Sequence, residues 1–223
     1  MQSDNNVTSA NEIQASAAIY NKTVLKIYDL WVHGFSNHYL WRCPTTHLIA
    51  LYQRYTSNNH LEVGVGTGFF LERVQFTQLK PRIVLMDLNP NTLEIVSKKM
   101  QRFQPAGVIN DILAGKQPNL PLFSSIAFNY VWHCLPAEAD KEQAFANLAT
   151  FLQTDGVLFG STLLAKDIEQ NIAAQSLMKL YQHKGIFGNQ YDDLNRLETA
   201  LQQNFSRYQI QQIGSAALFV AWK

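Results

Sequence analysis

Three glycines and three acidic residues have the types and the spacing needed to bind a nucleoside. They are Glu62, Gly64, Gly66, Gly68, Asp87 and Asp111. Glycine has no Cβ, so a ligand can approach its backbone closely. A carboxylate that follows a glycine loop at the separation of Asp87 can accept hydrogen bonds from the hydroxyls of a ribose. The pattern therefore predicts a nucleoside-binding site.

The glycine spacing separates two classes of ligand. A dinucleotide site has the pattern Gly-x-Gly-x-x-Gly, whose third glycine would fall at position 69, where the chain has Phe69. Glu62 lies two residues before the first glycine, and its carboxylate would repel a pyrophosphate but attract a cationic ammonium group. These features favour a nucleoside that carries an amino acid. An NAD-dependent oxidoreductase stays the alternative from a second enzyme class.

The elements that must position these residues alternate between strand and helix. Apolar runs predict strands over residues 60–65, 83–86, 107–109, 126–132, 157–160, 208–212 and 216–222. Helical patterns cover residues 15–31, 45–55, 69–76, 90–103, 137–151, 167–183 and 192–204. Such alternation predicts a parallel sheet with helices on both faces, and ligands bind at the carboxyl ends of its strands. The last two strands are close enough to form a hairpin at Gly214.

Four segments of the chain resemble the successive motifs of class I S-adenosylmethionine-dependent methyltransferases. They are residues 61–71, 84–90, 109–112 and 126–136. The resemblance implies an α/β fold with a Rossmann-like, seven-stranded, mostly parallel sheet, an antiparallel last strand and a helical cap. It also implies one domain with an N-terminal helical lid, a cofactor-binding core, a helical insertion and a terminal hairpin. Their expected ranges are residues 1–57, 58–165, 166–204 and 205–223.

The resemblance further implies which residues hold S-adenosylmethionine. In that family the glycine loop faces the methionyl and ribose parts, the acid ending the second strand holds the ribose, and the acid after the third strand meets the adenine amine. Asn129 would lie beneath the methionyl end, and Arg42 would reach the methionyl carboxylate. Carried over, the cofactor-binding residues are Glu62, Gly64, Gly66, Gly68, Asp87, Leu88, Asn89, Asp111, Ile112, Asn129 and Arg42.

His133 is the candidate catalytic residue. Imidazole titrates near neutral pH, so a histidine facing the transferred methyl group could act as a general base on a hydroxyl acceptor. The alternatives are a structural histidine, or an enzyme that relies on proximity and needs no base. Asn129 is not followed by the paired prolines typical of enzymes that methylate exocyclic or amide nitrogens. Methylation of DNA bases or glutamine amides is therefore disfavoured, and a small-molecule acceptor is favoured.

Aromatic and apolar residues crowd the two segments expected to cover the site. They are Tyr20, Tyr28, Trp31, Phe35, Tyr39 and Trp41 before the first strand, and Met178, Tyr181, Ile186, Phe187 and Tyr191 in the insertion. A pocket closed by such side chains would suit a flat or apolar small molecule. The alternative is that they form the core of the cap. Gly185 and Gly188 flank two of them, so we expect a mobile turn there.

Composition and residue spacing limit which partners we expect among nucleic acids, metals and membranes. The formal net charge is +1, so nothing indicates a nucleic-acid partner. His33, His38 and His47 match no common zinc spacing, and no metal is expected. The apolar stretch 216–222 is too short to span a bilayer, and no secretory signal is visible at the N-terminus.

Two distant cysteines favour a reducing, cytoplasmic location. A homodimer is left open. The sequence thus predicts S-adenosylmethionine-dependent methyl transfer to an oxygen of an aromatic or apolar metabolite. A protein or RNA methyltransferase and a non-catalytic S-adenosylmethionine-binding module stay as alternatives.

Overall fold

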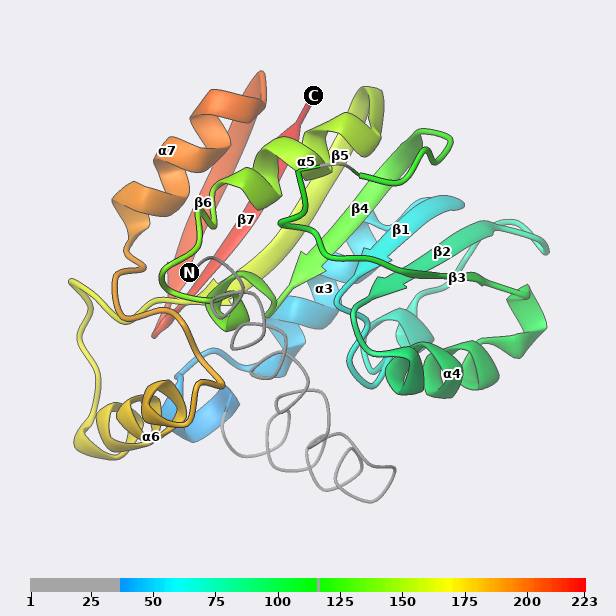
Figure 1. The fold of residues 1–223 in the computed structure, drawn as a ribbon. Helices are drawn as coiled ribbons and strands as arrows, with labels where there is room; N and C mark the ends of the chain where they lie inside the picture. Colours follow the sequence, from blue (N-terminus) through cyan, green and yellow to red (C-terminus); the bar gives the residue numbers. More distant parts are fainter. Residues whose placement is uncertain (1–36, 116) are drawn as a thin grey trace, which may run out of the picture.

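A seven-stranded sheet with the order β3-β2-β1-β4-β5-β7-β6 forms the centre of the molecule (Figure 1). The computed structural model describes residues 37–115 and 117–223. Strands β1 to β5 pair in parallel, and β7 runs antiparallel to both β5 and β6. This confirms the predicted fold class. The strands are Asn59–Val63 (β1), Arg82–Asp87 (β2), Ala106–Ile109 (β3), Phe123–Asn129 (β4), Leu152–Leu163 (β5), Arg207–Ile213 (β6) and Ala216–Trp222 (β7).

Helices cover both faces of the sheet. They are Thr45–Tyr55 (α3), Pro90–Lys99 (α4), Gln143–Phe151 (α5), Ile172–His183 (α6) and Leu194–Asn204 (α7), with single 3₁₀ turns at Leu71–Arg73 (η2), Gln101–Phe103 (η3) and Trp132–Cys134 (η4). Helices α5 and α7 lie on one side of the sheet and α3 on the other (Figure 1). Helix α6 lies apart from these layers, beyond the carboxyl ends of the parallel strands (Figure 1).

The four central residues of β2 show why a buried strand has an apolar sequence. Successive side chains of a strand point to opposite faces. Val84 and Met86 join the hydrophobic cluster beneath α5 and α7, whereas Ile83 and Leu85 join the cluster beneath α3 and α4. All four are buried. A strand covered on both faces therefore reads as one continuous apolar run.

The strand order reverses next to β1, which pairs with β2 on one side and β4 on the other. In open α/β sheets this reversal opens a crevice at the carboxyl ends of the strands. Gly64 directly follows β1, and Asp87 ends β2. The topology therefore brings the glycine loop and the second acid to one edge of the sheet.

The predicted helix over residues 69–76 is wrong, since only the turn η2 forms there. In an α-helix the Phe69 carbonyl would accept from the amide of Arg73. Instead that amide donates to Phe70, and the Arg73 guanidinium donates to the Phe69 carbonyl while lying 3.6 Å from the centre of the Phe69 ring. Burial of Phe70, Leu71 and Val74 also holds the segment against the core. Tertiary contacts here override the helical pattern.

Other predicted boundaries shift as well. The fourth strand ends at Asn129 rather than at residue 132, because Tyr130 has a left-handed backbone with φ of 57°. Helices predicted to begin at residues 137 and 167 begin at Gln143 and Ile172. The helix predicted over residues 15–31 lies outside the described residues. The division of the chain into lid, core, insertion and hairpin stays a prediction. Within residues 37–115 and 117–223, no helix is both long and apolar enough to cross a bilayer.

Candidate active site

A cavity of about 440 Å³ lies at the carboxyl ends of β1, β2 and β4. It collects every predicted site residue except Arg42, namely Glu62, Gly64, Gly66, Gly68, Asp87, Leu88, Asn89, Asp111, Ile112, Asn129 and His133. These residues come from four successive strand ends and the loops that follow them. The parallel topology explains how residues so distant in sequence meet in one place.

The three loop glycines differ in what surrounds them, although all have left-handed backbones, with φ of 70°, 50° and 72° for Gly64, Gly66 and Gly68. A Cβ on Gly64 would lie 2.2 Å from Val131, and one on Gly68 would lie 2.9 Å from Val96. A Cβ on Gly66 would meet nothing within 4 Å. Gly64 and Gly68 therefore permit packing of the protein on itself. Gly66 leaves room beside the cavity for a ligand.

Glu62 places a buried carboxylate at the cavity wall. Its Oε1 accepts a hydrogen bond from the Tyr52 hydroxyl at 2.5 Å, and its Oε2 lies 3.1 Å from His60 Nε2. In the part of the chain that the structure describes, no lysine or arginine pairs with it. A buried anion held by these two groups is suited to a cationic ligand group.

Sequence reasoning missed Tyr52 and His60. The signal for His60 was available, because residues two apart on a strand share a face. Its Nδ1 lies 2.8 Å from the Ser125 hydroxyl on β4, which fixes the ring between the two strands. Nothing in the sequence indicated Tyr52, which reaches Glu62 from α3.

Asp87 and Asp111 line the cavity on loops that hold their carboxylates in place. Asp87 Oδ1 accepts from the Asn89 amide at 2.8 Å, and Asp111 Oδ1 accepts from the Leu113 amide at 2.9 Å. Burial raises the pKa of Asp87, and backbone hydrogen bonds oppose that shift. Each carboxylate keeps a second oxygen that can accept from a ligand.

Asn129 and Tyr130 turn the chain over the cavity at the end of β4. The Ser161 hydroxyl donates to Asn129 Oδ1 at 2.6 Å, which leaves the NH₂ group as the donor that Asn129 can offer. Tyr130 is half-buried and has a left-handed backbone conformation. A non-glycine residue in this region is uncommon and costs about 1 kcal/mol or more. The bend sends η4, with His133, across the cavity.

The protein occupies one ring nitrogen of His133. Its Nδ1 accepts a hydrogen bond from the Leu163 amide at 3.3 Å, and an amide nitrogen can only donate. The proton of the neutral ring therefore sits on Nε2. Burial, with the nearby positive charge of Lys141, lowers the pKa of His133 to about 3. The occupied lone pair and the low pKa count against proton removal by His133, and the catalytic role of this residue stays a prediction.

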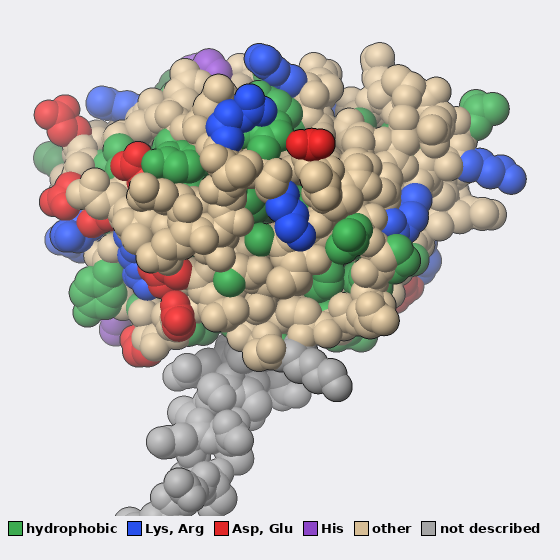
Figure 2. All heavy atoms as spheres, turned by 90° about the horizontal axis from the view of Figure 1, so that it is seen from above, with side chains coloured by type: hydrophobic (Ala, Val, Ile, Leu, Met, Phe, Trp, Pro, Cys, Tyr) green, Lys and Arg blue, Asp and Glu red, His purple; other side chains and the backbone are tan. Residues whose placement is uncertain are grey.

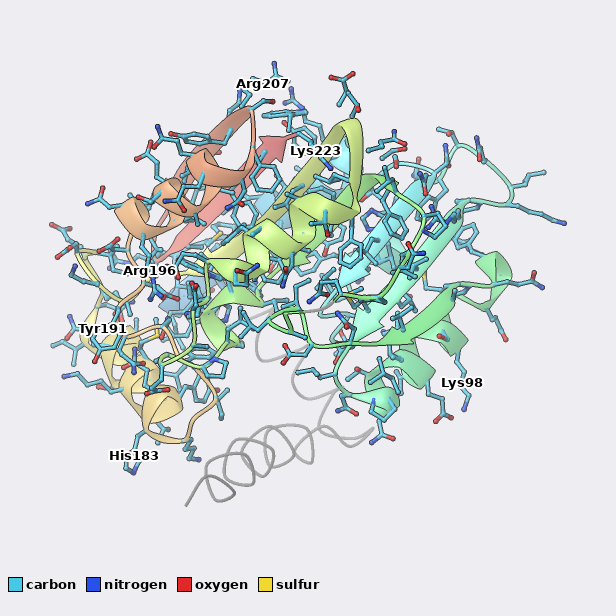
Figure 3. The ribbon with its side chains drawn as sticks, turned by 45° about the horizontal axis from the view of Figure 1, so that its top comes forward. Lys98, His183, Tyr191, Arg196, Arg207 and Lys223 are labelled. Atoms are coloured by element: carbon cyan, nitrogen blue, oxygen red, sulfur yellow. The ribbon has the colours of Figure 1, made fainter. Side chains whose placement is uncertain are left out.

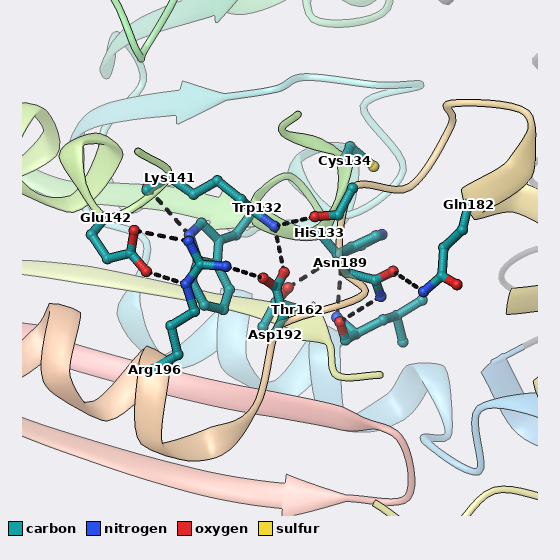
Figure 4. Close-up of polar contacts among 12 residues, drawn as sticks. Trp132, His133, Cys134, Lys141, Glu142, Thr162, Gln182, Asn189, Asp192 and Arg196 are labelled. Atoms are coloured by element: carbon teal, nitrogen blue, oxygen red, sulfur yellow. Dashed lines mark hydrogen bonds and ion pairs between the residues drawn. The ribbon is translucent and has the colours of Figure 1, made fainter. Parts of the chain in front are cut away.

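A buried network of ion pairs joins the loop after β4 to the loop before α7 (Figure 4). Lys141 Nζ donates to the carbonyl of Gly188 at 2.9 Å and pairs with Asp192, and both charged side chains are fully buried. Arg196 bonds Asp192 and, with two nitrogens, Glu142. Burial lowers the pKa of Lys141 and raises that of Asp192, whereas their mutual attraction opposes both shifts.

The network holds a covering segment, residues 185–188, against the cavity. The amide of Gly188 donates to the carbonyl of His133 at 2.9 Å, and a Cβ on Gly188 would lie 2.1 Å from the carbonyl oxygen of Leu135. Phe187 packs edge-on against the His133 ring, with centroids 4.7 Å apart. The loop after β4 and the covering segment therefore form one packed unit.

The aromatic and apolar residues of the predicted cap differ in their surroundings. Trp41, Tyr181, Ile186 and Phe187 line the cavity. Met178 is buried in the core beside them, while Tyr39 and Tyr191 are 61% and 62% exposed. Figure 3 shows Tyr191 at the outer surface of the molecule. Tyr20, Tyr28, Trp31 and Phe35 lie outside the described residues.

Arg42 is not brought together with the other predicted residues. Its side chain is exposed and does not line the cavity, although that of the preceding Trp41 does. The backbone of Arg42 is left-handed, with φ of 53°. Of the three histidines considered as metal ligands, His38 and His47 are exposed and His33 lies outside the described residues. The described residues contain no cluster of three or more metal-ligating side chains.

Comparison with known proteins identifies the family. A methyltransferase domain family matches residues 38–210, which is most of the chain. The chain belongs to the S-adenosylmethionine-dependent methyltransferases. The physcion biosynthesis cluster O-methyltransferase of Aspergillus chevalieri is 34% identical over 214 residues, covering 92% of this chain and 94% of that protein. The demethylluteothin O-methyltransferase of Streptomyces thioluteus is 30% identical over 204 residues, covering 91% and 89%.

Solved structures agree on the fold of this methyltransferase. The N-methyltransferase NodS from Bradyrhizobium japonicum, in complex with S-adenosyl-L-homocysteine, has a TM-score of 0.56 at 16% identity, covering 79% of this chain and 83% of that one. The family match and the two relatives confirm the predicted family, enzyme class and cofactor. The individual site residues stay predictions. The open space beside Gly66 and the buried anion at Glu62 fit the cofactor.

Proposed function

We propose that this methyltransferase transfers the methyl group of S-adenosylmethionine to an oxygen of a small aromatic or apolar metabolite. The observation that carries the proposal is the character of the cavity wall near His133. Phe187 packs against His133, Trp41 and Tyr181 there, and Ile186 and Leu163 also line the cavity. Such walls favour a flat, apolar acceptor through burial of its surface.

The cofactor residues divide the work of binding. Glu62 would hold the ammonium group, Asp87 the ribose hydroxyls, and Asp111 with Ile112 the adenine. Bound there, the cofactor supplies a methyl group on a positively charged sulfur. The protein then has to hold the acceptor oxygen in line with that carbon and exclude water, since correct positioning alone lowers the barrier substantially.

The two relatives named as O-methyltransferases support oxygen as the acceptor atom. Both match the chain over most of its length, so the likeness includes the segments that line the acceptor side of the cavity. The loop after Asn129 reads Tyr-Val-Trp, without the paired prolines of many nitrogen-directed enzymes.

A product screen tests the proposal. Purified enzyme is incubated with deuteromethyl-labelled S-adenosylmethionine and a panel of hydroxylated aromatic metabolites, and mass spectrometry locates the label. We expect label on oxygen in a small product. Label only in protein or RNA, or cofactor binding with no transfer to any acceptor, would favour the other readings of this fold.

Location and assembly also stay proposals. Cys43 and Cys134 are both free thiols, which fits a reducing compartment. We propose a cytoplasmic enzyme, to be tested by cell fractionation. Light scattering after size-exclusion chromatography distinguishes a monomer from a homodimer.

A further inference from the structure

We infer that His133 is a neutral hydrogen-bond donor to the acceptor oxygen and not the base that removes its proton. The inference rests on the proposed transfer to oxygen and assigns the residue that positions that oxygen. It is carried by which ring nitrogen the protein occupies and which it leaves open.

The first observation is that the protein occupies Nδ1. The Leu163 amide donates to it at 3.3 Å, and the Thr162 hydroxyl lies 3.4 Å away. This amide is a backbone group at the end of β5, and a backbone N–H can only donate a hydrogen bond. Whichever nitrogen accepts from an amide carries no proton in the neutral ring, which fixes the other nitrogen as N–H.

The second observation is that Nε2 opens into the cavity. It has no hydrogen-bond partner among the described residues. The only sealed side-chain polar atom without a partner in the described chain is the Thr56 hydroxyl, so Nε2 is not sealed within the protein. His133 lines the cavity, and the open nitrogen therefore faces that space.

The third observation is that the ring cannot turn over easily to present a lone pair. Phe187 packs edge-on against one part of the ring, with an interplanar angle of 88°. Tyr130 packs against another part, with centroids 5.6 Å apart and an angle of 80°. The carbonyl of His133 accepts from Gly188, which anchors the backbone. The ring is held as a fixed donor.

Other candidate bases beside it have the wrong protonation state at neutral pH. Desolvation raises the pKa of the half-buried Tyr130 hydroxyl well above its ordinary value, and an exposed thiol such as that of Cys134 ordinarily titrates above neutral pH. Both groups therefore stay protonated. The acceptor side of the cavity, as far as the structure describes it, has neutral walls.

The role of His133 follows from these features. As the acceptor binds, its hydroxyl gives its proton to solvent water, and the Nε2–H group donates to the resulting anionic oxygen. An electron pair of this oxygen then forms the bond to the methyl carbon, the carbon–sulfur bond breaks, and its electrons stay on sulfur. A charge-assisted hydrogen bond lowers the pKa of the bound hydroxyl and fixes its direction. His133 acts only as a hydrogen-bond donor, and its ring neither loses nor gains a proton during the reaction.

Nitrogen-15 NMR of histidine-labelled protein with S-adenosylhomocysteine bound tests the tautomer without any turnover. His133→Gln identifies the His133 signals by their loss, and His183→Gln removes an exposed histidine as a control. From about pH 5 to about pH 8 we expect the neutral Nε2–H pattern and no titration. An Nδ1–H pattern, or protonation within this range, would overturn the inference.

The rate measurement compares His133→Gln, which keeps a donor near the position of Nε2, with His133→Leu, which does not. Neither can be a base. We expect His133→Gln to be at least about tenfold faster than His133→Leu, and the acid limb of the pH–rate profile to move up by about one unit in His133→Leu. Equal losses in both variants would contradict the donor role. Wild-type transfer to nitrogen alone would instead refute the proposed function, while the NMR result would still stand.

Discussion

Single residues of the glycine loop have separable tasks. Gly64 lies against Val131, whereas Gly66 borders open space. An alanine at either position pays about 1–2 kcal/mol for a left-handed backbone. Beyond this shared strain, the consequences should differ in kind.

We predict that Gly64→Ala mainly destabilises the fold and Gly66→Ala mainly weakens cofactor binding. The Gly64 Cβ would clash with Val131, but the Gly66 Cβ would enter the space left for the ligand. Thermal unfolding and calorimetric titration with S-adenosylhomocysteine measure the two effects. The assignment fails if Gly66→Ala binds as tightly as the wild type.

Asp87 is the residue whose loss should reduce affinity most directly. Removing its charge-assisted hydrogen bonds to the ribose in Asp87→Ala should cost about 1.5–3 kcal/mol, which is roughly a 10- to 150-fold rise in Kd. Glu169→Ala removes an exposed carboxylate away from the cavity and serves as the matched control. Unchanged affinity in Asp87→Ala would refute the ribose assignment.

His133 should also make stability depend on pH. Its pKa falls from an ordinary value of 6.5 to about 3 on folding, so the unfolded chain binds the proton more readily. The stability linked to neutral His133 is complete above pH 6.5 and is lost as the pH falls toward 3. The slope contributed by one such group is at most about 1.4 kcal/mol per pH unit.

Urea unfolding of the wild type and of His133→Gln between pH 3 and pH 6.5 measures how much His133 contributes to the pH dependence of stability. The free energy of unfolding should fall less steeply with decreasing pH in the variant, since it lacks the titrating ring. Parallel curves would mean that His133 does not differ in protonation between the folded and unfolded states.

At the scale of elements, the buried network connects the loop after β4 with α7 and the covering segment. In Lys141→Met, Asp192 would stay buried with Arg196 as its remaining partner. We predict a loss of about 3–5 kcal/mol in the free energy of unfolding, the range for breaking a buried pair.

The double variant Lys141→Met with Asp192→Asn is the control for this prediction, because it removes both charges. It should recover part of the loss, measured by urea denaturation. A single variant that unfolds within about 1 kcal/mol of the wild type would contradict a structural role for the pair.

The sequence predicted the elements of the sheet far better than the contacts between its loops. The apolar runs around Ile83 and Leu158 could be recognised because burial on both faces demands them. The pairing of Lys141 with Asp192 could not, since the two residues are 51 positions apart and nothing local relates them. The left-handed turn at Tyr130 was equally invisible, because no local signal marks a strained backbone.

The cofactor half of the candidate site was predicted more fully than the acceptor half. Glycines and acids at strand ends are placed by topology alone, as Gly66 and Asp87 illustrate. The tautomer of His133 depends on the Leu163 amide, a backbone group that any residue would supply. A contact made by a backbone amide cannot be predicted from the types of the residues involved.

At the scale of the whole molecule, the charge distribution matches the small-molecule function. The formal net charge is +1. On the face that Figure 2 shows, basic and acidic side chains are scattered among uncharged ones and form no continuous basic patch. A few charged side chains are buried instead, namely Glu62 at the cavity wall and Lys141 and Asp192 in the network.

The central claim is that the cavity holds S-adenosylmethionine with its ammonium at Glu62 and its sulfur toward His133 and the aromatic walls. A crystal structure of the S-adenosylhomocysteine complex tests it most directly. We predict ribose hydroxyls bonded to Asp87, adenine beside Asp111 and Ile112, and the sulfur facing the open Nε2 of His133. A ligand bound in the reverse direction, or outside this cavity, would contradict the account.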